Sequence, residues 1–75
     1  PLPDFTHDLN ALRDEPEKIL REAEWFSTLE YDGETRLFYM YWGSARGNHA
    51  NECDAAEARA RALAVEAGLK AMRDA

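Results

Sequence analysis

His49 and Cys53 are the residues whose types and spacing come nearest to a chemical site. They lie four residues apart, where we predict the last helix to begin, and the N-terminus of a helix favours a thiolate. A metal site, however, needs more than two protein ligands. The other histidine, His7, belongs to a distant segment, and no Cys-x-x-Cys or His-x-x-x-His pair completes a set. We therefore expect no metal and no cofactor.

Two further features of the sequence could carry chemistry. The segment 43–48, Gly-Ser-Ala-Arg-Gly-Asn, is small and flexible enough to hold an anion ahead of a helix. It lacks the spacing of a phosphate-binding loop, so we predict an ordinary connection. The many Asp and Glu residues of the first half show no pair that must share a desolvated pocket, so we predict no catalytic residues and do not expect an enzyme.

Residues 37–42 form a run of six large apolar or aromatic side chains, Leu-Phe-Tyr-Met-Tyr-Trp. Successive side chains of a strand point to opposite faces, so both faces of this strand are apolar. The two faces carry Leu37, Tyr39 and Tyr41 on one side and Phe38, Met40 and Trp42 on the other. A chain of 75 residues can cover one side of a two-stranded ribbon but seldom both. We expect the uncovered side to meet a partner or another copy of the chain.

Two short helices are predicted ahead of this ribbon. Asp4 can cap a helix over 4–13. The segment 14–17, Asp-Glu-Pro-Glu, has an acidic cap, a first-turn proline and a carboxylate three residues after the cap, which predicts a second helix to about Glu24. Its inward residues would be Ile19, Leu20 and Ala23.

An antiparallel hairpin is predicted from strands over 27–31 and 35–42, joined through Asp32-Gly33. The register stays open. A two-residue turn pairs Tyr31 with Glu34, whereas a turn with Gly33 as a bulge pairs Glu30 with Glu34.

The last helix is predicted to begin between His49 and Asp54 and to run to the C-terminus. Asn51 or Asp54 would cap it, and its inner stripe would be Ala55, Ala58, Ala62, Val65, Leu69 and Met72. Gly68 within this pattern indicates a close contact or a frayed end. The fold class is then α+β in the order α-α-β-β-α, with residues 1–75 forming a single domain.

Charge and composition indicate the kind of partner. The net charge is −6, with −7 over residues 1–34 and +1 over 35–75. A nucleic-acid-binding domain is normally basic, so we regard nucleic acid as an unlikely partner. A basic protein surface is the expected partner. Residues 1–4 lack the pattern of a signal peptide, and no apolar run is long enough for a membrane span, so we expect no contact with a membrane. A single cysteine fits a reducing compartment, so we expect a cytoplasmic protein.

We therefore expect a small, acidic, non-enzymatic interaction module, an inhibitor or regulator of the kind that phages and bacteria encode. The expected apolar contacts are Leu37, Tyr39 and Tyr41, and the expected steering charges are Glu17, Glu22, Glu24, Glu30, Asp32 and Glu34. Two alternatives stay open. One is a homodimer built through the hairpin. The other is a nucleic-acid module that stacks bases on the aromatic strand.

Overall fold

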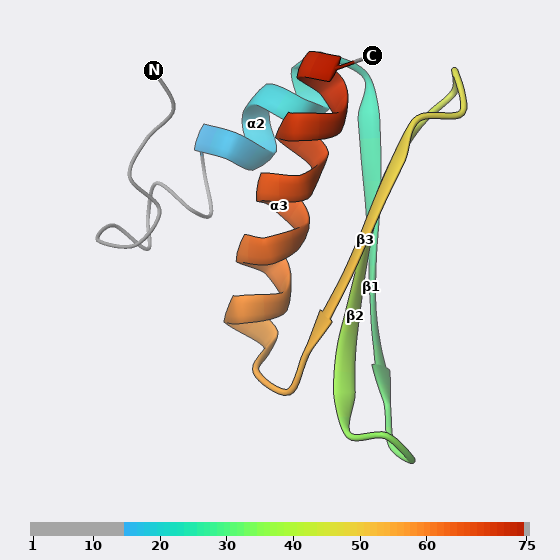
Figure 1. Ribbon diagram of the computed structural model, residues 1–75, viewed down its shortest axis with the longest axis vertical. Helices are drawn as coiled ribbons and strands as arrows, with labels where there is room; N and C mark the ends of the chain where they lie inside the picture. The colour runs from blue at the N-terminus through green and yellow to red at the C-terminus, as the bar shows by residue number, and fades with distance from the viewer. Residues whose placement is uncertain (1–14, 75) are drawn as a thin grey trace.

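The protein is an α+β fold in which two helices cover one face of a three-stranded antiparallel sheet (Figure 1). A computed structural model describes residues 15–74. In chain order the elements are α2 (Glu15–Glu22), β1 (Trp25–Asp32), β2 (Leu37–Ser44), β3 (His49–Asp54) and α3 (Glu57–Asp74). The predicted α+β class and the long C-terminal helix are confirmed. The predicted hairpin is part of a three-stranded sheet instead, and the helix predicted over 4–13 lies outside the described residues.

Helix α2 is followed by a turn that contains a left-handed residue, Glu24, with φ 66°. The Glu24 N–H donates to the Arg21 carbonyl at 3.0 Å, which closes the last turn. Of the predicted inward residues, Leu20 is buried, whereas Ile19 and Ala23 are exposed. Pro16 and Glu17 are buried in their place, because α2 packs against α3 as well as against β1.

The β1–β2 hairpin has neither of the two registers that the sequence left open. Asp32 pairs with Leu37 across a four-residue turn, 33–36. Asp32 Oδ1 accepts hydrogen bonds from the N–H of Glu34 at 2.8 Å and of Thr35 at 3.3 Å. The Arg36 N–H donates to the Asp32 carbonyl at 2.7 Å, with Arg36 at φ 60°. The Asp32 side chain therefore organises a longer turn than the Asp-Gly pair alone indicates.

The prediction that the last helix begins between His49 and Asp54 is wrong, because these residues form strand β3. A turn over 45–48 leads into it, closed by a Ser44 N–H to Asn48 carbonyl hydrogen bond of 2.9 Å. The segment His-Ala-Asn-Glu-Cys-Asp has little intrinsic preference for a strand. It pairs along β2 nonetheless, with Ala50 opposite Trp42, since the backbone groups of that apolar central strand need partners.

Helix α3 begins at Glu57, and Asp54 Oδ2 accepts a hydrogen bond from the Ala56 N–H at 2.9 Å just before it. The predicted inner stripe is right for its second half only. Ala55 precedes the helix and Ala58 is exposed, whereas the buried residues of α3 are Ala60, Ala64, Val65, Gly68 and Leu69. The buried stripe is wider because α3 packs against both the sheet and α2.

Gly68 marks a close contact rather than a frayed end. A Cβ at this position would lie 3.1 Å from Leu20 Cδ1 and 3.6 Å from Trp42 Cβ. Leu20 and Trp42 are fully buried. The core around them consists of Leu20, Trp25, Met40, Trp42, Ala64, Val65 and Leu69. The absent side chain lets α3 approach both α2 and the central strand.

Candidate functional site

The candidate site is the face of the sheet that neither helix covers. In β2 the side chains of Phe38, Met40 and Trp42 point toward the helix layer, and the alternate residues point to the opposite side. The register then places every second residue of all three strands on that opposite side. We call it the open face, and its side chains are Phe26, Thr28, Glu30, Asp32, Leu37, Tyr39, Tyr41, His49, Asn51 and Cys53.

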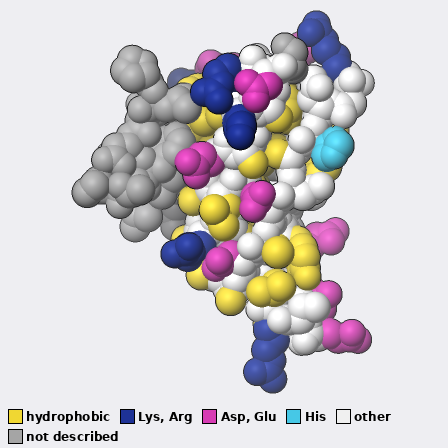
Figure 2. All heavy atoms as spheres, viewed as in Figure 1, with side chains coloured by type: hydrophobic (Ala, Val, Ile, Leu, Met, Phe, Trp, Pro, Cys, Tyr) yellow, Lys and Arg dark blue, Asp and Glu magenta, His cyan; other side chains and the backbone are white. Residues whose placement is uncertain are grey.

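The open face combines exposed aromatic rings with negative charge. Phe26 is 53% exposed and Tyr39 is 39% exposed. Glu30 and Asp32 supply two carboxylates, and no Lys or Arg lies on this face in the described part of the chain. Figure 2 shows hydrophobic side chains gathered at the end of the sheet below α3, with acidic side chains beside them and a Lys or Arg side chain at the tip. The surface therefore complements an apolar patch that carries positive charge.

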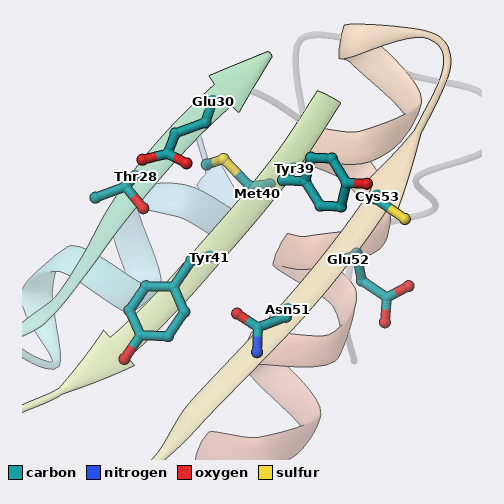
Figure 3. A pocket seen from close by; sticks show the side chains of 8 residues that line it. All are labelled: Thr28, Glu30, Tyr39, Met40, Tyr41, Asn51, Glu52 and Cys53. Carbon is teal, nitrogen blue, oxygen red and sulfur yellow. The ribbon is translucent and has the colours of Figure 1, made fainter. Parts of the chain in front are cut away.

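A hollow of about 520 Å³ lies in the middle of the open face (Figure 3). Its side-chain lining comes from all three strands, with Thr28 and Glu30 from β1, Tyr39 and Tyr41 from β2, and Asn51 and Cys53 from β3. Met40 and Glu52 also line it. Because their positions in the register point toward the helix layer, they supply the floor.

The two tyrosine rings lean away from each other along β2 and so leave the hollow between them. The hydroxyl of Tyr39 lies 3.3 Å from Thr35 Oγ1, beside the β1–β2 turn. Tyr41 leans the opposite way and covers Gly43, where an added Cβ would lie 2.7 Å from Tyr41 Cζ. The Tyr41 ring stacks on His49 with centroids 6.4 Å apart and an interplanar angle of 17°. Neighbouring side chains thus hold each ring in place.

The structure brings together five of the nine residues expected to bind a partner, and it separates the other four. Leu37, Tyr39, Tyr41, Glu30 and Asp32 share the open face. Glu34 lies in the turn at one end of the sheet. Glu22 and Glu24 are exposed at the other end of β1, where α2 meets the sheet.

Glu17 is not a surface charge. It is only 3% exposed and accepts two hydrogen bonds from the Arg61 guanidinium, at 3.1 and 3.3 Å. Sequence position alone did not reveal this, because Arg61 lies 44 residues further along the chain. Glu17 therefore joins α2 to α3 and takes no part in the open face.

Sequence reasoning missed the residues that β3 contributes, since it placed them in a helix. His49, Asn51 and Cys53 stand on the open face because β3 pairs with β2. The signal that could have found them was the segment 45–48, a short polar turn after an apolar strand, which is also typical of a hairpin.

His49 and Cys53 cannot share one metal ion. On a strand, residues four apart are separated by roughly 13 Å, whereas one helical turn would bring them together. Among the residues that the structure describes, no group of three or more His, Cys, Asp or Glu side chains is arranged to hold a metal. Cys53 is a free and exposed thiol.

Comparisons with models of known protein families, with curated proteins and with solved structures found no match to this chain. None of the helices described in residues 15–74 is long and apolar enough to cross a membrane.

Proposed function

We propose that this protein is a small, non-enzymatic interaction module that binds a partner protein through the open face of its sheet. The observation that carries the proposal is a continuous aromatic and acidic surface that, among residues 15–74, has no helix above it and no Lys or Arg on it. Tyrosines suit such a surface, because they tolerate water when free and bury a large area when bound. We place the module in the cytoplasm, since a single cysteine fits a reducing compartment.

A basic partner surface explains the charge of the face better than a second copy of the chain does. Two open faces packed against each other would bring together Glu30 and Asp32 of both copies, and no Lys or Arg of the described strands lies on either face to neutralise them. Buried carboxylates without partners are costly. A net charge of −6 would also speed the encounter with a basic target. Binding of this kind would inhibit or regulate the partner by occupying its surface.

Binding is favoured over catalysis by the openness of the hollow. Catalytic sites strengthen their electrostatic interactions by excluding water from the reacting groups. The hollow between Tyr39 and Tyr41 lies on a sheet face that is open to solvent. Its polar groups are therefore better placed to orient a partner than to stabilise a transition state.

The proposal predicts that tyrosines of the open face are needed for partner capture. Tyr39→Ser and Tyr41→Ser should each lower the recovery of bound proteins from an extract of the native host at least about tenfold, since buried aromatic anchors contribute much of the energy at interfaces. The measurement is capture on the immobilised full chain, followed by mass spectrometry.

Tyr31→Ser is the matched control for these two variants. Tyr31 is 56% exposed and belongs to the same sheet, but it lies on the opposite face, with its ring 4.7 Å from that of Phe38. It should recover the same proteins as the unmodified chain. Equal recovery by all three variants would show that the open face is not the binding surface.

A further inference from the structure

We infer that the hollow between Tyr39 and Tyr41 receives an arginine side chain of the partner. This inference rests on the proposed function and names the chemical group that the open face recognises. Figure 3 shows the two rings at opposite ends of the hollow, with Thr28 and Glu30 on one flank and Asn51 and Cys53 on the other.

Three polar side chains of the hollow can each accept a hydrogen bond from a cationic donor. Glu30 offers a carboxylate, Thr28 a hydroxyl oxygen and Asn51 an amide carbonyl. Within the described residues, none of these three side chains makes a hydrogen bond or an ion pair. Guanidinium carries five N–H donors and no acceptor, so it can bond to several of them at once.

The aromatic walls favour the same group. A guanidinium is planar and weakly hydrated, and it stacks on tyrosine rings while its edge donates hydrogen bonds. Lysine is a compact, strongly hydrated charge, which fits a hollow with acceptors on two separate flanks less well. Anions are disfavoured, because Glu30 lines the hollow and no Lys or Arg does.

The strand spacing also suits one long side chain that enters from above. Thr28 and Glu30 stand on β1 and Asn51 on β3, so the flanks are two strand spacings apart, roughly 10 Å. The main chain of the partner could pass over the sheet and place an arginine side chain in the hollow without approaching the sheet backbone.

The test is an NMR titration of the full chain with a short peptide, acetyl-Gly-Gly-Arg-Gly-Gly-amide. We expect saturable shifts of the amide signals of Thr28, Glu30, Tyr41 and Asn51. The same peptide with citrulline, which is neutral but similar in shape, should give no saturable shifts, and the lysine peptide should bind more weakly. Glu30→Gln should weaken the arginine peptide about tenfold, equivalent to the loss of about 1.4 kcal/mol.

Glu34→Gln is the matched control, because it makes the same change of net charge in the exposed turn outside the hollow. It should alter the affinity by less than about twofold, since exposed charges act weakly over a distance. The inference is overturned if citrulline and arginine peptides bind alike, if the two Gln variants weaken binding equally, or if the shifted signals lie away from the hollow.

The two proposals fail in different ways. If Tyr39→Ser and Tyr41→Ser lose the captured proteins while the arginine peptide produces no saturable shifts, the open face is a binding surface and the arginine site is wrong. If the peptide binds as described but capture is unaffected by both variants, the hollow binds guanidinium and the proposed function is wrong.

Discussion

Glu17 shows how a single buried carboxylate can join two helices. Its side chain meets Arg61 of α3 through two hydrogen bonds, and Arg21 Nη2 of its own helix lies 3.6 Å from Oε1. Arg61 is itself only partly exposed, at 39%. Charge-assisted bonds of this kind are stronger than neutral ones, and an arginine left without its carboxylate loses most of that benefit.

We predict that Glu17→Gln lowers the free energy of unfolding by about 1 to 2 kcal/mol, because the amide accepts fewer and weaker hydrogen bonds from Arg61. Urea unfolding followed by tryptophan fluorescence measures the change. Glu22→Gln is the control, since Glu22 is exposed and lies 3.9 Å from an equally exposed Lys18. It should cost less than about 0.5 kcal/mol. Equal losses in the two variants would contradict the role assigned to Glu17.

At the scale of the element, the end of α2 carries conformational strain. Glu24 adopts φ 66° between the helix and β1, a left-handed conformation that glycine reaches without the clash of a Cβ. The hydrogen bonds of Ala23 to Ile19 and of Glu24 to Arg21 fix this geometry. The exposed Glu24 side chain makes no ion pair with another described residue.

Glu24→Gly should therefore raise the free energy of unfolding by about 0.5 to 1 kcal/mol, although the flexibility of glycine in the unfolded chain reduces the gain. Thermal and urea unfolding both report it. Glu24→Ala removes the same charge but keeps a Cβ in the left-handed conformation, so it should show no such gain. A larger gain with alanine than with glycine would mean that charge, and not backbone strain, governs this position.

At the scale of the whole molecule, the asymmetry between the two faces of the sheet governs association. One face packs against α2 and α3, while the other is open and negatively charged in the described part of the chain. Self-association through the open face is opposed by its carboxylates. The outer strands β1 and β3 each have one edge without a strand partner in the described sheet, and such edges can pair with other chains.

We predict a monomer at micromolar concentration and low salt, because repulsion between chains of net charge −6 is least screened there. Sedimentation equilibrium at two salt concentrations measures the mass. A dimer that persists at high salt and survives Tyr39→Ser would instead support pairing between strand edges. Tight binding of an oligonucleotide that weakens steeply with salt would favour the nucleic-acid alternative.

The sequence by itself determined the features that depend on local patterns. The alternation along 37–42 assigned Tyr39 and Tyr41 to one face and Met40 and Trp42 to the other, because strand geometry fixes that period. Glycine at 68 indicated a close contact or a frayed end, and the structure decided for a contact with Leu20 and Trp42, which were not predictable. The α+β class and the C-terminal helix also followed from local signals.

Only the tertiary structure decided which distant residues meet. Strand β3 has little local preference for its conformation and forms because β2 offers a long apolar partner. The pairing of β3 with β2 places Asn51 at the hollow. The turn organised by Asp32 sets the register of β1 and β2, in which Glu30 lies opposite Tyr39. Glu17 and Arg61 likewise meet only after α2 packs on α3. Such contacts join chain segments that are far apart in the sequence. They therefore stabilise the fold only when the whole sheet and both helices have assembled.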